Sequence, residues 1–342
     1  MTLRMPAEWE KQKAIWLAWP HNKEDWPGKF ETIKWVYVEI IKYLTQGVRV
    51  RLLVKNAGER QKALDILAIS HIDLSRVDLI IAPTNRSWLR DSAPVFVYDG
   101  KQPTLLDWRF NAWAKYDNWQ SDDKVPECVK KFLDLPSIQP EHKGRRVVLE
   151  GGSIEVNGKG TLITTEECLL SDIQCRNPGF LREDYEQVFA RYLGISHVIW
   201  LGSGIEGDDT HGHIDDLVRF VNATMVVTVI ETDKNERNYA PLNDNLKRLK
   251  AARDQDGKKL DIIELPMPKK NMFDGQILPA SYVNFLISNN TVLVPTFNDP
   301  NDRVSLDLLA GVFPKHTVIG IYCGDFILGL GTIHCASQQE YA

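Results

Sequence analysis

The sequence predicts an α/β chain in which five units, each made of strands and one helix, close around an axis. Amphipathic helices alternate with short, β-branched strands along the whole chain. A polar or reactive cluster precedes a short apolar strand five times, at intervals of about 59, 63, 71 and 51 residues, which indicates a repeat of roughly 60 residues. No Pro/Gly/Ser-rich or low-complexity segment divides the 342 residues, so we expect one domain over 1–342.

Helices are expected where apolar residues recur at a spacing of three and four. The first runs from Lys29 to Gln46, and Gly47 ends it. The side chains that share its apolar face are Phe30, Ile33, Tyr37, Ile40, Ile41 and Leu44. Further helices are expected at about 59–69, 123–133, 182–193, 241–252 and 302–312. Short apolar runs predict strands at 48–54, 77–81, 147–150, 197–200, 225–230, 260–264, 292–295 and 317–322.

The five clusters bring together residue types that can carry chemistry. They are Arg90-Asp91 before a strand at 95–97, Glu150-Gly151-Gly152 before 154–156, His211-Gly212-His213 before 217–221, Ser281–Asn284 before 285–287, and Cys335. Cys335 follows a glycine-containing loop, in which backbone can approach a ligand closely. Five units around one axis would point these clusters at one central cavity.

Composition excludes several classes of function. A net charge of −5 provides no basic field for nucleic acid. No run approaches the roughly 18 apolar residues of a membrane span. Five cysteines without a CxxC pair argue against a disulfide framework and against a Cys-built zinc site. The apolar part of the N-terminus contains charges and a proline, unlike a signal peptide, so we expect a cytoplasmic protein.

The expected cavity suits a planar cation. Its residues would be Trp88, Arg90, Asp91, Glu150, His213, Asp215 and Cys335. Carboxylates pair with the forked N–H donors of a guanidinium, and a tryptophan can cover a cationic face. A thiolate can attack the guanidinium carbon while a histidine carries protons, so no metal or cofactor is required. We expect Arg90 to anchor neighbouring carboxylates and Trp88 to pack or to bind substrate. Asp208 and Asp209 are expected to be solvated, although an acid there could meet a substrate amine.

The sequence resembles the agmatine deiminase family of the guanidine-modifying (pentein) superfamily, which also holds the bacterial type of peptidylarginine deiminase. The matching runs are PAEWE and IWLAWP near the start, NRSWLRDSAP at 85–94, FNAW at 110–113, EGGSIEVNGKGTLITTEECLL at 150–170, THGHIDDLVRFV at 210–221, NDPNDRVSLDLL at 298–309 and GTIHCASQQ at 331–339. The resemblance implies a five-bladed α/β propeller, the pentein fold, with pseudo-five-fold symmetry around a central active site. It also implies hydrolysis of agmatine to N-carbamoylputrescine and ammonia, a step toward putrescine in polyamine metabolism.

The resemblance implies a role for each matching residue. Cys335 would be the nucleophile, His213 with Glu150 would transfer protons, and Asp91 with Asp215 would bind the guanidinium. Trp88 and Asp209 are further candidates for substrate binding. The implied partner is a small cationic guanidino substrate, and a homodimer is expected on the resemblance alone. Three positions depart from many relatives: Gly329-Leu330-Gly331-Thr332 replaces a run of glycines, Arg86 replaces an acid, and Ala93 replaces glycine.

Other functions are open from the residues. The same chemistry could act on free arginine or peptidyl-arginine, or could pass the intermediate to an amine, as an amidinotransferase does. His211, His213 and Asp215 could instead bind a metal in a hydrolase, because alternate residues of a strand share one face. A non-catalytic binding protein is disfavoured, because the Cys and His are both present. The other cysteines, Cys128, Cys168, Cys175 and Cys323, are expected to be inert.

Overall fold

The computed structural model describes residues 3–342 and confirms the α/β class. Within these residues, five sheets share one pattern: one strand is antiparallel to a second, and the second is parallel to a third that follows a helix. The helix is needed as a crossover, because parallel neighbours cannot be joined by a tight turn. This repetition agrees with the repeat that the sequence predicts.

The chain divides into two compact units, each described here by itself. Unit one comprises Met1–Ala7 and Asp91–Met267, and unit two comprises Glu8–Arg90 and Pro268–Ala342. A single domain over 1–342 stays a prediction, and its first two residues lie outside the described part of the chain.

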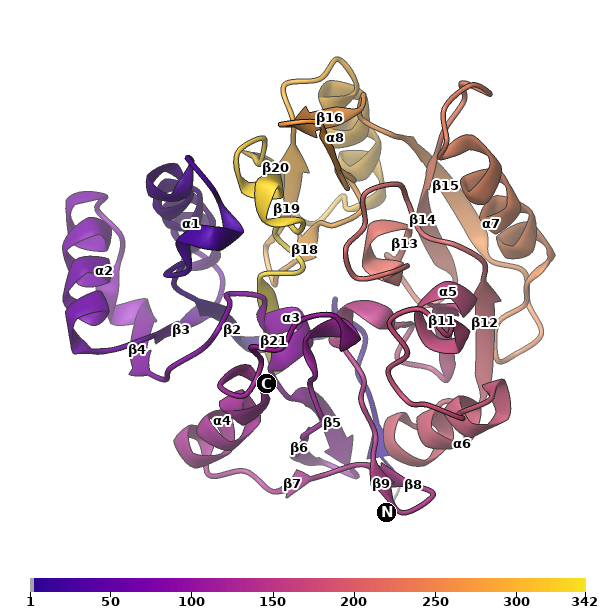
Figure 1. The fold of residues 1–342 in the computed structure, drawn as a ribbon, viewed down its shortest axis with the longest axis horizontal. Coiled ribbons are helices and arrows are strands. Elements are labelled where there is room, and N and C mark those ends of the chain that lie inside the picture. Colours follow the sequence, from indigo (N-terminus) through magenta and orange to yellow (C-terminus); the bar gives the residue numbers. More distant parts are fainter. Residues whose placement is uncertain (1–2) are drawn as a thin grey trace. The chain divides into compact units, whose positions relative to one another are not determined.

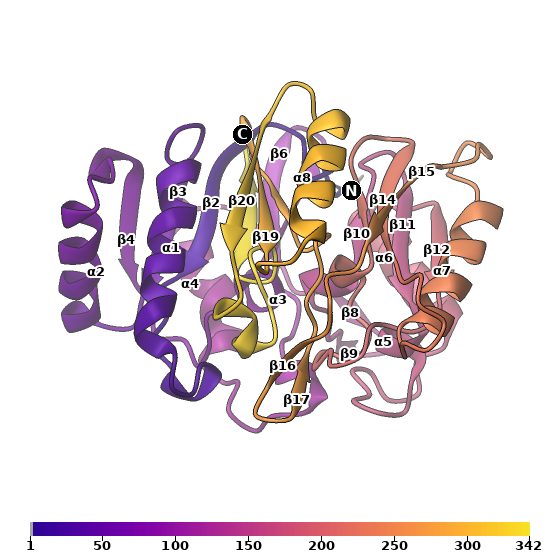
Figure 2. The same cartoon turned by 90° about the horizontal axis from the view of Figure 1, so that it is seen from above.

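Unit one holds three of the repeated sheets, coloured purple to orange in Figure 1 except for the indigo β1. Their strands are, sheet by sheet, β1 (Leu3–Arg4), β5 (Val95–Asp99), β6 (Gln102–Leu106) and β7 (Ser137–Ile138); β10 (Glu155–Val156), β11 (Thr161–Thr165) and β12 (His197–Leu201); and β13 (Val218–Phe220), β14 (Met225–Ile230) and β15 (Asp261–Pro266). The helices are α4 (Val125–Leu133), α5 (Glu166–Leu170), α6 (Arg182–Leu193) and α7 (Tyr239–Ala251). Helix α7 packs on β12 and β14 (Figures 1 and 2). A hairpin of β8 (Glu141–His142) and β9 (Arg145–Arg146) lies outside the three sheets.

Unit two holds the other two repeated sheets. Their strands are β21 (Ser337–Tyr341), β2 (Gln12–Ala18), β3 (Arg49–Val54) and β4 (Val77–Ile81), then β18 (Leu286–Ile287), β19 (Thr291–Thr296) and β20 (Thr317–Tyr322). The helices are α1 (Phe30–Leu44), α2 (Ala57–Ile69) and α8 (Asn301–Val312). Figure 2 shows α1 beside β3 and α8 beside β20. The short helix α3 (Leu89–Ser92) spans the residues at which one unit follows the other, and β16 (Asn271–Phe273) pairs with β17 (Gln276–Leu278).

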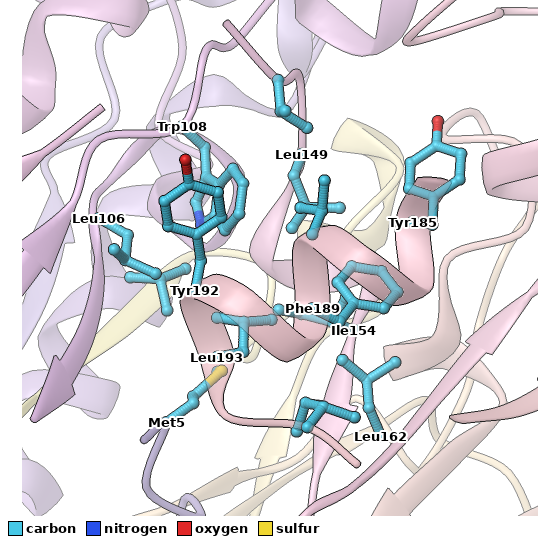
Figure 3. Packing of buried hydrophobic residues seen from close by; sticks show 14 of the residues in the cluster. Met5, Leu106, Trp108, Leu149, Ile154, Leu162, Tyr185, Phe189, Tyr192 and Leu193 are labelled. Atoms are coloured by element: carbon cyan, nitrogen blue, oxygen red, sulfur yellow. The ribbon is translucent and has the colours of Figure 1, made fainter. Parts of the chain in front are cut away.

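The main apolar core of unit one is organised around α6. Tyr185, Phe189, Tyr192 and Leu193 point from this helix toward side chains of the surrounding strands and loops (Figure 3). The neighbours labelled there are Met5, Leu106, Trp108, Leu149, Ile154 and Leu162. Burying such side chains contributes about 1.5–3 kcal/mol each, so this core holds the loops that follow its strands in place.

All six expected helices are present, with ends that differ by a few residues at most. The strand expected at 147–150 is wrong: only an isolated bridge joins Val148 to Arg109 there, and the segment leads into a 3-10 turn, Gly151–Ser153. The structure adds strands that the sequence pattern missed, including β2, β6, β11 and β21. No helix among the described residues is long and apolar enough to cross a membrane.

Candidate active site

In unit one, three of the five expected clusters bring their acids around one imidazole. His213 Nδ1 lies 3.9 Å from Asp91 Oδ1 and 4.0 Å from Asp215 Oδ1, and His213 Nε2 lies 3.8 Å from Glu150 Oε2. All four side chains are almost fully buried. Gly152 makes this approach feasible, because a Cβ at that position would lie 2.5 Å from His213 Nδ1. Four residues far apart in the sequence therefore form one charged cluster.

The charges in this cluster are set by burial and by neighbouring ions. Burial alone would lower the pKa of His213, but Asp91, Cys168 and Glu150 raise it well above its ordinary value. Burial raises the pKa of Asp91 to about 6, because the His213 charge offsets that effect only in part. Burial would also raise the pKa of Glu150, but Arg176 and His213 together outweigh that effect and lower this pKa to about 2. His213 is therefore an imidazolium at neutral pH, beside an ionised Glu150.

Arg176 provides the counter-charge of Glu150. Its Nε donates to Glu150 Oε1 at 3.1 Å, and both side chains are fully buried. The other guanidinium nitrogens donate to backbone carbonyls of Gln174 and Thr210. Because Thr210 precedes the His211-Gly212-His213 turn, one buried cation fixes both the charge of Glu150 and the backbone that leads to the imidazole.

The turn that carries His213 is held from two sides. Asp208 accepts hydrogen bonds from the backbone N–H groups of Gly212 at 2.7 Å and His213 at 3.1 Å, so the expectation that Asp208 is simply solvated is wrong. Thr165, the N-cap of α5, donates its hydroxyl to Gly212 O at 2.5 Å. Cys168 on α5 is buried, and its sulfur, an oxygen of Glu150 and a ring nitrogen of His213 all lie within 4.8 Å of one another.

Asp91 is held by a tryptophan from an unusual turn. Trp113 Nε1 donates to Asp91 Oδ2 at 2.9 Å, while the Gly152 N–H donates to Oδ1 at 3.0 Å. Trp113 has φ 59°, and Ala112 and Ala114 beside it also have positive φ. Left-handed backbone costs a non-glycine residue about 1–2 kcal/mol, so this turn is strained where it supports a buried carboxylate.

In unit two, the predicted nucleophile is held by a neighbouring amide. Asn284 Nδ2 donates to Cys335 Sγ at 3.0 Å, and both residues are buried. The Cys335 carbonyl accepts the backbone N–H of Arg90 at 3.1 Å. Position 284 marks the fourth cluster of the sequence repeat, so unit two joins the fourth and fifth clusters.

Arg90 contacts one carboxylate, that of Glu8, as the sequence predicts, and it also anchors the segment around Cys335. Its guanidinium donates to His334 O at 3.3 Å and to Gln339 Oε1 at 2.6 Å, and lies 3.6 Å from Glu8 Oε2. Glu8 also contacts His334 Nε2 at 2.8 Å and accepts the Ile287 N–H. These contacts hold the residues on both sides of Cys335 in place.

Trp88 belongs to a buried aromatic group in unit two. Its ring stacks on Phe326, with centroids 5.7 Å apart, and packs against Trp26 at 5.5 Å. A Cβ on Gly331 would lie 3.0 Å from Cys335 Cβ and 3.1 Å from the Trp88 ring, so this glycine separates ring and thiol. Trp88 therefore packs beside the nucleophile, and its contact with substrate stays a prediction.

Two further expectations concern residues of the His213 loop. Both carboxylate oxygens of Asp209 are engaged, one by Lys115 and the other by Tyr116 Oη at 2.8 Å, so its role toward a substrate amine stays a prediction. His211 does not join the His213 cluster: its Nε2 lies 3.1 Å from Ser171 Oγ, and its Nδ1 lies 3.8 Å from Glu167. The two imidazoles lie on a loop, where strand alternation does not apply, and this geometry disfavours the metal-binding alternative.

Sequence reasoning missed Arg176, Trp113 and the role of Asn284. Arg176 lies outside every expected cluster, in a segment with no periodic pattern. Trp113 lies in the FNAW run, which carried the family resemblance but no assigned role. Asn284 was recognised only as a marker of the repeat, and the repeat itself was the signal that could have identified it.

Known proteins resemble the whole chain. The family model of the Porphyromonas-type peptidyl-arginine deiminases matches residues 4–340. The agmatine deiminase of Ectopseudomonas mendocina is 33% identical, over 99% of this chain and 95% of that protein. The solved agmatine deiminase of Enterococcus faecalis has a TM-score of 0.90 at 31% identity and covers 99% of this chain and 96% of its own. A cysteine-to-serine variant of the C. jejuni agmatine deiminase, solved with substrate bound, has a TM-score of 0.89 at 29% identity, with the same coverages.

These similarities confirm the family resemblance and the pentein class of α/β fold. Closure of five blades around an axis stays a prediction.

Proposed function

Because the chain belongs to the family of Porphyromonas-type peptidyl-arginine deiminases and agmatine deiminases, we propose that it hydrolyses agmatine to N-carbamoylputrescine and ammonia. The observation that carries the proposal is the buried cluster of three carboxylates around His213. Charges buried in a low-dielectric interior need partners, and the three carboxylates here already share the charges of His213 and Arg176. A guanidinium suits such a cluster, because it brings a positive charge and paired donors that carboxylates accept.

Cys335 opens the reaction. Its thiolate forms an S–C bond to the guanidinium carbon, which becomes tetrahedral. Asp91 and Asp215 hold the guanidinium nitrogens, and the pKa of Asp91, about 6, leaves it mostly ionised at neutral pH. Covalent catalysis suits this substrate, because resonance makes a guanidinium a poor target for water.

His213 supplies the protons. It starts as an imidazolium, because its pKa is raised well above the ordinary value, so it acts first as an acid. It gives its proton to one nitrogen, the C–N bond breaks and ammonia leaves, which yields a thiouronium. The neutral imidazole then takes a proton from water and the oxygen adds to the carbon. The C–S bond breaks and the remaining hydroxyl proton is lost to solvent, where it is taken up by ammonia, so that the ureido product and the thiolate are released.

Glu150 stabilises the protonated form of His213. Arg176 and His213 outweigh burial and lower the pKa of Glu150 to about 2, so it is ionised at neutral pH, and this anion favours the imidazolium each time the proton returns. Arg176 maintains that charge without contacting the reacting atoms, so it is a positioning residue.

Agmatine is favoured among guanidino compounds because curated relatives over nearly the full length are named agmatine deiminases. Arginine and peptidyl-arginine are the alternatives within the family. The proposal also covers a small guanidino substrate as the partner and the cytoplasm as the compartment.

The test is turnover of three substrates offered in parallel. Wild-type and Cys335→Ala protein receive agmatine, free arginine and an arginyl peptide, and ammonia and ureido product are quantified. We expect turnover of agmatine by wild type and none by the variant. Preferred turnover of arginine or the peptide would support the thiol mechanism but would reject agmatine as the substrate. Activity that survives the loss of Cys335 would reject the thiol mechanism.

A further inference from the structure

Asn284 contacts the reacting atom of the nucleophile through a bond whose direction is fixed. Its Nδ2 lies 3.0 Å from Cys335 Sγ. Its Oδ1 accepts three hydrogen bonds, from Thr332 Oγ1 at 2.6 Å, from the His334 N–H at 3.1 Å and from the Cys335 N–H at 3.4 Å. Rotating the amide by 180° would place its NH₂ against three donors, so the network assigns the N–H groups to the sulfur.

The backbone of Asn284 is also held, which leaves the amide little freedom. Its carbonyl accepts the His334 N–H at 3.2 Å, and its own N–H donates to Ser281 O at 3.4 Å. The side chain is about 1% exposed. A donor that is already oriented costs no reorganisation when charge develops on the sulfur.

We propose that Asn284 is a catalytic residue that stabilises the thiolate of Cys335, both before the attack and when the thiolate leaves. The inference deepens the proposed function and rests on it for the identity of the nucleophile. A thiolate accepts an N–H hydrogen bond more strongly than a thiol does, so a fixed donor favours the anion.

The bond acts twice in each turnover. When the S–C bond forms, the sulfur loses its negative charge and the N–H···S bond weakens. When the C–S bond breaks, the charge returns to sulfur and the bond strengthens, which assists departure of the thiolate. Stabilising a thiolate also lowers its intrinsic nucleophilicity, but with a Brønsted coefficient of about 0.4–0.5 a tenfold gain in thiolate outweighs a roughly threefold loss in reactivity.

The charged groups around the Cys335 segment of unit two bind one another. They are Glu8, Arg90 and His334. The contacts described above link Glu8 to both of the others, and Arg90 also reaches the His334 carbonyl and Gln339. Asn284, in contrast, donates directly to the sulfur at 3.0 Å.

The experiment measures the thiol directly and requires no substrate. Wild type, Asn284→Asp and Asn284→Leu are treated with iodoacetamide at pH 7, and alkylation of Cys335 is followed by peptide mass spectrometry. Cys128, half-buried on α4, is the internal reference in the same sample. The Asp side chain keeps an oxygen for the three donors and removes the N–H groups, so it separates loss of the thiolate contact from loss of folding.

We expect Cys335 alkylation to fall about threefold relative to Cys128 in both variants, the net of a tenfold loss of thiolate and a roughly threefold gain in its reactivity. At high pH, where every thiol is ionised, the variants should no longer react more slowly than wild type. Asn289→Asp is the matched control, because Asn289 is a half-buried amide in the same unit that bonds to Gln12 and Gly47. It should react like wild type.

Two outcomes would overturn the inference: Cys335 alkylation unchanged in Asn284→Asp, or a wild-type Cys335 that reacts no faster than Cys128 at pH 7. Agmatine turnover is measured on the same samples. Its absence in wild type rejects the proposed function, whereas normal turnover by wild type with unchanged alkylation in the variant rejects only the role of Asn284.

Discussion

Arg176 donates to Glu150 at 3.1 Å in an ion pair from which solvent is fully excluded. Glu150 is part of the His213 cluster, and a further hydrogen bond from Arg176 reaches the Thr210 carbonyl in the loop that carries His213. We therefore expect stability and catalysis to depend on the same cation. The folded-state pKa of Glu150, about 2, is below its ordinary value of 4.5, so its contribution to stability is present above about 4.5 and is lost as pH falls toward 2.

Arg176→Met should destabilise the protein by about 3–5 kcal/mol, because it leaves the charge of Glu150 buried without its partner. Glu150→Gln added to it should recover part of that loss, since the unpaired charge is then gone. Urea denaturation of the two single variants and the double variant measures the coupling. Additive losses would show that the pair is not coupled.

Activity separates the role of Arg176 from general stability. Arg219 and Glu155 form another buried ion pair in unit one, at 2.9 Å, outside the His213 cluster. Arg219→Met should also destabilise the protein, yet its folded fraction should keep the wild-type kcat. Arg176→Met should lower kcat of the folded fraction and displace its pH profile, because the proton affinities of Glu150 and His213 change. Equal kcat in the two variants would contradict this assignment.

We expect the ionised Asp91 carboxylate to lower the stability of the folded protein. Burial raises its pKa from 3.8 to about 6, so the folded state disfavours the ionised form, and the penalty grows as pH rises from about 4 to 6. The full penalty is about 3 kcal/mol, from 1.36 kcal/mol for each pH unit. Asp91→Asn should therefore gain stability over wild type across this interval and hold the gain above it, while losing activity. The measurement is urea unfolding of both proteins between pH 4.5 and 7.5, and a difference independent of pH would reject it.

Local patterns predicted the fold well and the site in part. Helical periodicity located α1 and α6, and the repeat of about 60 residues marked His213 and Cys335 as candidates, because a polar cluster precedes a short apolar strand in each repeat. The local sequence pattern could not identify Arg176, because its role depends on its ion pair with Glu150, which is 26 residues away in the sequence. The pattern also predicted a strand at 147–150. That prediction is wrong because an apolar run indicates that a segment is buried, but not that it forms hydrogen bonds with a neighbouring strand. The side chains of Asp208 and Asp209 looked solvated for a similar reason, since their partners are backbone N–H groups, Lys115 and Tyr116.

The reaction should proceed without metal. The proposed chemistry uses a thiolate and an imidazolium, and His211 contacts Ser171 and Glu167, apart from His213. Dialysis against EDTA should leave agmatine turnover unchanged, and elemental analysis should find no stoichiometric zinc, manganese or iron. A metal present at one per chain and required for turnover would restore the hydrolase alternative.

Leu330 has φ 65° between two glycines, at one of the positions where this sequence departs from many relatives. Left-handed backbone costs a residue with a Cβ about 1–2 kcal/mol, and glycine avoids that cost. Leu330→Gly and Leu330→Ala remove nearly the same side-chain contacts, so their difference reports on the backbone. We expect the Gly variant to be more stable than the Ala variant by about 1 kcal/mol, the reverse of the order in regular helices and strands.

The same pair of substitutions at Leu328 is the control, because Leu328 lies in the preceding 3-10 helix, Phe326–Gly329, and is not among the residues with positive φ. There the Ala variant should be at least as stable as the Gly variant. Urea denaturation of the four variants measures the difference in stability between Ala and Gly at each position. An Ala variant more stable than the Gly variant at position 330 would show that the strain of this loop is relieved by other contacts, and that the departure from a glycine run carries no cost ahead of Cys335.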